Sequence, residues 1–297
     1  MRVAFNSQFR DALSGIAEAA KRLVEAQRQV SSGRRVTKPS DDPSAAAGAV
    51  AERAQLAATE QYERAANSTA ARLNVTDSVL DNILATLTAA QSTALSGQGS
   101  TKSATEREAA AQYVEGLRTA LLSDFNATFH GTYVFAGVKT TTKPYVESGG
   151  VVGAYAGSTT EVGIDISDAR SVTVGFNGEA ITKGSDAKDV FAVFDDLIVA
   201  LRAGDDAGIT TALAGVARAF DRATTAQTRV GVALKAIETE GQRLRDVKLA
   251  VGARLSRLED ADMAQAITEM TRAEAAYQAA LGATAKSARA SLFDYLG

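Results

Sequence analysis

Apolar side chains recur every seven residues over most of this chain, and this spacing constrains its fold more than any other feature. The repeated residues are Phe9, Ile16, Leu23 and Val30 in the first tract, and Val216, Ala223, Val230, Ile237, Leu244, Val251 and Leu258 in the last third. Such a repeat places the side chains on one narrow stripe of an α-helix, as in coiled coils. Only three prolines interrupt the 297 residues. The sequence therefore predicts a mainly α fold in which long helices pack along one another.

The helical pattern has clear interruptions. Helical tracts are predicted up to about residue 32, then at 45–94, 105–129, 186–201 and from 206 to about 258. Beyond residue 260 the apolar stripe changes phase and restarts with Met263, Met270 and Tyr277, beside Ile267 and Leu281. A phase shift of this kind indicates a joint between two helical segments.

Between residues 132 and 185 the apolar period changes from helical to two. Strands are predicted at 132–136, 151–155, 161–166 and 171–176, separated by glycines. We expect this small β insert to face solvent and to be dispensable for the helices. The full prediction is a mainly α, coiled-coil-like helical hairpin rod, with both termini together and the β insert at the far end.

We predict three domains from these tracts. The terminal helical assembly domain comprises 1–38 and 260–297, the helical rod domain comprises 39–135 and 187–259, and the β-rich insert domain comprises 136–186.

The segment from Ser31 to Ala45 joins the first two helical tracts. Gly33 ends the first helix, because glycine readily adopts the left-handed conformation found at helix C-termini. Asp42 followed by Pro43 is typical of an N-cap and a first helical residue. The segment is therefore predicted to be a charged hinge, with these residues: Arg34, Arg35, Asp41, Asp42 and Pro43. Asp41 and Asp42 are interpreted as capping residues rather than as a catalytic acid and base.

Three segments resemble the bacterial flagellin superfamily, and within it the members that join the flagellar hook to the filament. They are the hinge segment 31–45, the run Tyr133-Val134-Phe135-Ala136-Gly137-Val138-Lys139-Thr140, and the final Ser291-Leu292-Phe293-Asp294-Tyr295-Leu296. The hinge segment alone is shared with flagellin itself. The resemblance implies an extracellular structural protein at the hook-filament junction, exported without a cleaved signal peptide.

The same resemblance implies partners. They are further copies of the chain in a ring or tier, an adjacent hook-associated protein, flagellin, and a cytoplasmic export chaperone. The terminal stripes are rich in alanine and bury little area in one hairpin, so we expect them to order on assembly. The predicted assembly residues are Phe5, Phe9, Ile16, Leu23, Ile267, Met270, Tyr277, Leu281, Leu292, Tyr295 and Leu296.

Other functional classes find little support in the sequence. A net charge of −3 does not favour nucleic-acid binding, and no window is apolar enough for membrane insertion. No catalytic, cofactor or metal constellation is recognised, and the single histidine, His130, is interpreted as a turn residue. We therefore predict no enzyme activity and no cofactor. Flagellin and a cytoplasmic coiled-coil scaffold remain the alternatives.

Overall fold

The computed structural model describes the backbone of residues 2–99, 102–168 and 170–296, and the side chains from residue 10 to residue 286 within these ranges. The helices are α1 (Arg2–Ser32), α2 (Pro43–Gly97), α3 (Ala104–Phe125), α4 (Gly178–Thr182), α5 (Val190–Ala203), α6 (Asp206–Glu259) and α7 (Met263–Leu296). The strands are β1 (Thr128–Phe129), β2 (Thr132–Tyr133), β3 (Glu147–Ser148), β4 (Val151–Val152), β5 (Val162–Ser167) and β6 (Arg170–Gly175). The predicted mainly α class with a small β part is confirmed.

The chain forms two compact units. One comprises residues 1–58 and 247–297, and the other comprises residues 59–246. The first holds α1, α7 and the adjoining ends of α2 and α6, and we call it the terminal unit. The second holds the remainder of α2 and α6, helices α3 to α5 and all six strands, and we call it the central unit. The three predicted domains differ from this division and remain a prediction.

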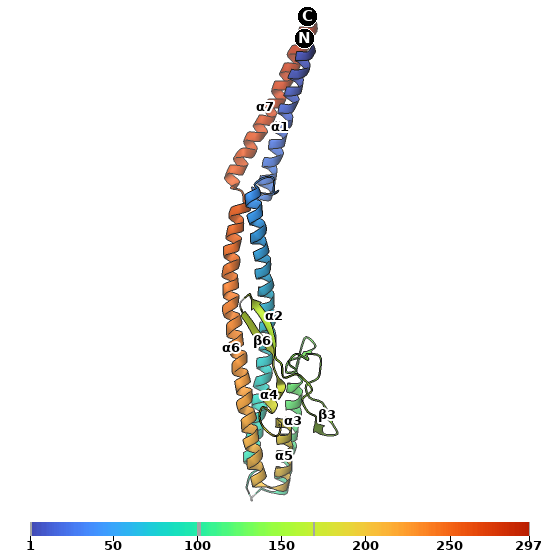
Figure 1. The fold of residues 1–297 in the computed structure, drawn as a ribbon, viewed down its shortest axis with the longest axis vertical. Helices are drawn as coiled ribbons and strands as arrows, with labels where there is room; N and C mark the ends of the chain where they lie inside the picture. The colour runs from blue at the N-terminus through green and yellow to red at the C-terminus, as the bar shows by residue number, and fades with distance from the viewer. Residues whose placement is uncertain (1, 100–101, 169, 297) are drawn as a thin grey trace. The chain divides into compact units, whose positions relative to one another are not determined.

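The seven-residue stripes form the core of the central unit. The stripe of α2 meets that of α6, and the buried residues are Leu73, Leu80, Ile83, Leu87, Ala90, Ala94, Val216, Ala223, Val230 and Ile237. The two helices run antiparallel here, because Gln227 reaches Asp81 and Gln98 reaches Thr210 through side-chain hydrogen bonds. Helices α3 and α5 pack on each other beside them (Figure 1). The stripe identified in the sequence is therefore the packing seam of this unit.

Aromatic residues from distant segments meet in the same core. Tyr145 lies 5.0 Å from Phe191 and 6.0 Å from Phe125, measured between ring centroids, and Phe125 lies 5.5 Å from Phe135. Tyr145 is 1% exposed. It comes from the predicted insert, whereas Phe191 belongs to α5. The expectation that the insert faces solvent is wrong at this position, because the fully buried Tyr145 ring fills part of the helical core.

The strands form three separate antiparallel hairpins, β1–β2, β3–β4 and β5–β6. Only β5 and β6 have the predicted length; the predicted strands at 132–136 and 151–155 shorten to two residues each. His130 and Gly131 both have positive φ, 49° and 77°, in the turn between β1 and β2, so the prediction for His130 is confirmed. The helical residues 178–182 were not expected inside the insert.

Two arginines, one from α2 and one from α3, attach these hairpins to the helices. Arg72 of α2 donates to the carbonyl oxygens of Val174 and Tyr133, at 2.9 and 3.2 Å. Arg118 of α3 is 4% exposed and lies 2.9 Å from a Glu147 carboxylate oxygen at the β3–β4 hairpin. The hairpins are thus held by specific hydrogen bonds as well as by apolar packing.

In the terminal unit α1 and α7 run antiparallel along each other, with the start of α1 and the end of α7 at the same end of the pair (Figure 1). Their facing residues include many alanines, and Ala26 and Ala266 are the most buried. In the part of the chain that the structure describes, no helix is long and apolar enough to cross a membrane.

Candidate functional site: the joint of the terminal unit

The predicted hinge and the predicted phase shift lie side by side. Gly33 ends α1 with φ +67°, as expected for a helix C-terminus. The Ala261 N–H donates to the Gly33 carbonyl oxygen at 2.9 Å, and Arg34 forms a β-bridge with Asp260. Residues 33–42 and 259–262 therefore meet in one structure, which we call the joint.

The two aspartates of the joint accept backbone hydrogen bonds. One Asp42 carboxylate oxygen accepts from the Ala45 N–H at 3.0 Å, which confirms its role as the N-cap of α2. This bond, with smaller contributions from the Ser44 hydroxyl and the Arg35 guanidinium, lowers the Asp42 pKa to about 2. Asp41 accepts from the N–H groups of Thr37 and Lys38, at 3.1 and 2.9 Å. These bonds lower the pKa of Asp41 as well. Both carboxylates stay ionised near neutral pH and order the chain around them.

The arginines of the joint connect segments that are distant in sequence. Arg35 Nη1 lies 3.2 Å from Asp42, and Arg35 Nη2 donates to the Leu258 carbonyl oxygen at 3.2 Å. The Arg35 backbone N–H also donates to the Glu259 carbonyl oxygen at 2.7 Å. Arg35 therefore links the start of α2 to the end of α6.

Glu259 is the buried charge of the joint, and it was missed as a site residue in the sequence. Its side chain is 4% exposed and lies 2.6 Å from Arg53 and 3.7 Å from Arg34. A carboxylate at a helix C-terminus faces the negative end of the helix dipole, so this position is unfavourable without cations nearby. That local conflict at the end of α6 is the signal that could have revealed it.

The predicted assembly residues of α1 and α7 differ in their position relative to the seam between the two helices. Ile16 and Leu23 of α1, and Met270 and Tyr277 of α7, are half-buried on the seam of the α1/α7 pair. Ile267 and Leu281 were predicted on that same stripe, but they are 48% and 42% exposed. The reason is helical geometry: each directly follows a seam residue and so lies beside the seam rather than in it. The remaining predicted residues lie outside the described side chains: Phe5, Phe9, Leu292, Tyr295 and Leu296.

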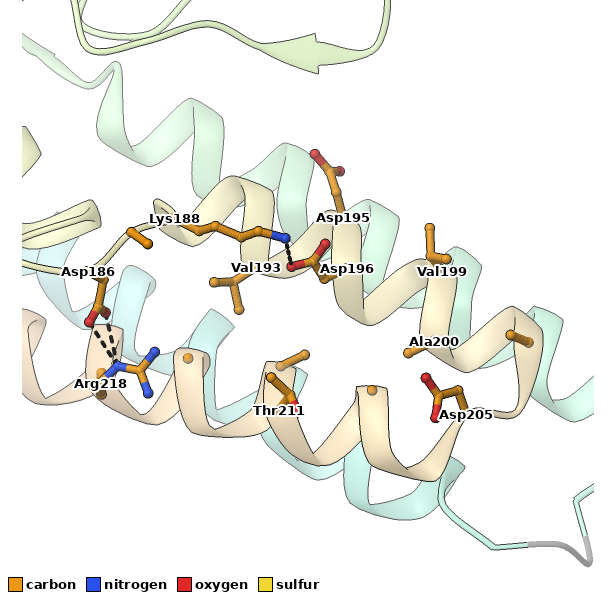
Figure 2. A pocket seen from close by; sticks show the side chains of 15 residues that line it. Asp186, Lys188, Val193, Asp195, Asp196, Val199, Ala200, Asp205, Thr211 and Arg218 are labelled. Carbon is orange, nitrogen blue, oxygen red and sulfur yellow. Dashed lines mark hydrogen bonds and ion pairs between the residues drawn. The ribbon is translucent and has the colours of Figure 1, made fainter.

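A groove of about 640 Å³ lies between α5 and the start of α6 in the central unit (Figure 2). Four of its charged residues pair with each other: Lys188 lies 2.6 Å from Asp196, and Arg218 lies 3.0 Å from Asp186. Asp195 pairs with Arg118 at 2.7 Å. The groove therefore presents paired charges around a floor of small residues. Within the described residues, no group of three or more potential ligands could hold a metal ion.

Comparison with known proteins identifies the class. The model of the bacterial flagellin N-terminal helical region matches residues 4–140, and that of the flagellin C-terminal helical region matches residues 213–296. Together they cover most of the chain, including both halves of the joint. The chain belongs to the bacterial flagellin family.

More specific relatives are hook-associated proteins. Flagellar hook-associated protein 3 of Salmonella typhimurium strain LT2 is 28% identical over 302 residues, which cover 94% of each chain. The Escherichia coli K12 protein of that name is 28% identical, over 99% of each chain. Among solved structures, a putative flagellar hook-associated protein from Vibrio parahaemolyticus has a TM-score of 0.70 and 19% identity, and covers 74% of this chain and 100% of its own. The flagellar junction protein FlgL from Legionella pneumophila has a TM-score of 0.61 and 14% identity, with 72% and 100% coverage. These two structures show the same fold.

Proposed function

We propose that this chain is a structural subunit of the bacterial flagellum that joins the hook to the filament and assembles through its terminal helices. The observation that carries the proposal is the match to hook-associated relatives over nearly the whole chain, terminal helices included. The flagellin-type terminal regions lie at the two ends of the matched sequence. Several large apolar side chains of the terminal unit are exposed, and subunit contacts would cover such groups: Leu13, Val24, Val50, Leu249, Met263, Ile267 and Leu281.

The proposal includes the location and the partners. The protein acts outside the cell, at the hook-filament junction, after export without a cleaved signal peptide. It contacts further copies of itself, a hook-associated protein on one side and flagellin on the other. Its role is structural and not enzymatic, because its charged residues serve as caps and ion pairs in the joint and in the groove.

Deletion and complementation of the gene test this function. Cells without the protein should keep intact hooks while flagellin escapes unassembled into the medium, and re-expression should restore filaments. The protein should be recovered at full length from sheared flagella. Long filaments made of this chain alone would instead identify a filament subunit, and retention in the cytoplasm would identify a scaffold.

The apolar C-terminal residues give a finer proposal. The residues Leu292, Phe293, Tyr295 and Leu296 bind an export chaperone in the cytoplasm and later enter a subunit contact, so the two states exclude each other. Changing Leu292 and Leu296 together to serine should reduce both chaperone binding and incorporation at the hook tip. If both persist unchanged, the tail is not the shared interface.

A further inference from the structure

An exposed loop of the β-rich segment carries an apolar side chain beside unpaired positive charges. Val138 is 51% exposed, and the next residue, Lys139, is exposed as well. Residues 138–143 also include Lys143 and contain no acidic residue. Within the described part of the chain, neither lysine makes an ion pair. We call Val138 and Lys139 the insert tip. Its chemistry fits a surface that is both apolar and acidic.

Backbone hydrogen bonds give the insert tip a fixed shape. The Val138 N–H donates to the Thr160 carbonyl oxygen at 3.0 Å, and the Thr142 N–H donates to the Lys139 carbonyl oxygen at 2.9 Å. Gly137 has a φ of +57°, and a Cβ at this position would collide with the Ser158 carbonyl oxygen. A preformed loop loses little conformational entropy when it binds. The insert tip is therefore suited to a contact with another molecule.

The groove between α5 and α6 has the complementary chemistry. Val199 of α5 lines it and is 67% exposed, above a floor of small residues that includes Ala200 and Ala212 (Figure 2). Four aspartates line the groove against one lysine and one arginine, so its charge is negative. Asp205, at the turn between the helices, accepts the Ala207 N–H at 3.1 Å. Among the described residues, Asp205 has no cationic partner.

The two surfaces belong to different sides of the central unit. The loop of the insert tip lies against α3, where Lys143 and Thr119 line the same cavity. Helix α3 in turn packs on α5, and Arg118 of α3 lies 2.7 Å from Asp195 of α5. The groove is on the side of α5 that faces α6 (Figure 2). Because α3 and α5 separate them, the insert tip cannot enter the groove of its own chain.

We propose that the groove binds the insert tip of a second copy of this chain. Val138 of one copy packs against Val199 of the next, and Lys139 pairs with Asp205. The occupant is a second copy because the chain itself carries the basic, apolar and preformed segment that the acidic groove requires. The contact is heterologous, since two different surfaces meet, and it repeats from copy to copy. The inference rests on the proposed structural function and adds a contact that does not involve the terminal helices.

Cysteine cross-linking tests this contact directly, because the chain contains no cysteine. Two full-length versions with different tags, Val138→Cys and Val199→Cys, are expressed together in cells that lack the native protein, and isolated flagella are oxidised. We expect a disulfide-linked heterodimer that carries both tags. The matched control replaces Val199→Cys by Val232→Cys. Val232 is equally exposed, at 67%, but lies on α6 about four turns beyond Arg218 of the groove, so this pair should give no heterodimer.

A chain that carries both Val138→Cys and Val199→Cys tests the geometry of the contact. It should give a ladder of trimers and larger species, because a heterologous contact leaves one unused surface at each end of an oligomer. A self-complementary contact would stop at dimers and would overturn the proposal.

The outcomes separate this inference from the proposed function. If the cysteine variants support filaments but cross-link no better than the control pair, the contact is wrong while the junction function stands. When Val199→Cys is expressed with native copies of every other flagellar protein, a disulfide only to one of those proteins would also overturn the contact. Absence of the unmodified protein from flagella would contradict the function itself.

Charge reversal tests the ion pair, with the yield of the heterodimer as the readout. Lys139→Glu in the Val138→Cys chain, or Asp205→Lys in the Val199→Cys chain, should each lower the yield about two- to fivefold, because like charges then meet. Both changes together should restore the yield. They lie on different chains, so restoration identifies a pair across copies. Equal yields in all four combinations would overturn the pairing of Lys139 with Asp205.

Discussion

At the scale of single residues, the joint is built from charges that have defined partners. Arg35 links Asp42 to the end of α6. Glu259 is shielded from water and forms ion pairs with Arg34 and Arg53. An ionised group that loses water needs partners of opposite charge or hydrogen bonds in return. The joint therefore has one preferred arrangement of its segments, held by a few specific side chains.

Replacing Glu259 should destabilise the joint. Glu259→Ala removes the shared partner of two arginines and should lower the free energy of unfolding by about 1–2 kcal/mol, a value reduced because both arginines are half exposed. Urea unfolding followed by circular dichroism measures the change. Glu18→Ala is the control, because the Glu18–Arg22 pair is exposed and should contribute little. Equal effects of the two substitutions would contradict this account.

Acid should weaken the α2 cap. The Asp42 pKa is lowered from 3.8 to about 2 in the folded chain, so its stabilising effect is present above about pH 4 and is lost as the pH falls through about 2. Asp42→Ser keeps a capping oxygen but no charge. The melting temperature of the native chain should therefore fall toward that of the serine variant over this range. A gap between the two that stays constant from about pH 5 to about pH 2 would argue against an ionised cap.

At the scale of elements, the hairpins and helices of the central unit share one core. Tyr145 contacts Phe125 and Phe191, and its hydroxyl lies 2.6 Å from the Thr182 hydroxyl. These rings come from a loop and from two helices that are separated in the sequence. Their packing therefore holds these three segments together. The β-rich segment is therefore part of the structure that stabilises the helices.

Truncating Tyr145 tests this shared core. Tyr145→Ala should lower the free energy of unfolding by roughly 3–5 kcal/mol, because a buried aromatic side chain is removed. Tyr145→Phe should cost about 1 kcal/mol, through the bond to Thr182 alone. Tyr113→Ala is the control, since Tyr113 is 54% exposed. Chemical unfolding monitored by circular dichroism of the helices gives these free energies. A small effect of Tyr145→Ala would support the expectation that the insert is dispensable for the helices.

At the scale of the whole molecule, the two units differ in how much apolar surface they bury. The central unit buries leucine, isoleucine and aromatic side chains completely, whereas the seam of the α1/α7 pair is mostly half-exposed. Burial of apolar area is the main contribution that offsets the entropy of ordering a chain. The terminal helices should therefore be the first part of the isolated chain to open.

Hydrogen exchange should resolve this difference. In the verified monomer, amides of α1 and α7 should exchange faster than those of α2 and α6 inside the central unit, and proteases should trim to about Lys38 and about Glu259. Assembly into flagella should slow exchange in the terminal helices. Equal protection of both units in the monomer would contradict coupled ordering and assembly.

The sequence by itself determined the long helices, their seams and the joint, because these depend on short-range rules. Seven-residue spacing defines a seam, Gly33 ends a helix and Asp42 begins one, and each of these features is present in the structure. The flagellin resemblance was likewise carried by contiguous residues. Helix boundaries near 190 were less accurate, since the cap Asp189 follows other polar residues that could serve equally.

Only the tertiary structure decided which distant groups meet. The place of Glu259 at the C-terminus of α6 sets it apart from the other acidic residues of that helix, but only the structure shows that Arg34 and Arg53 approach it. From the sequence, Tyr145 belongs to an insert that is expected to face solvent, and only the structure places its ring against Phe125 of α3 and Phe191 of α5. Ile267 and Leu281 belong to the same repeat as Met270, and only the position of α1 shows which of them it covers. Periodicity specifies the faces of each helix, whereas the partner of each face depends on contacts between residues far apart in the chain.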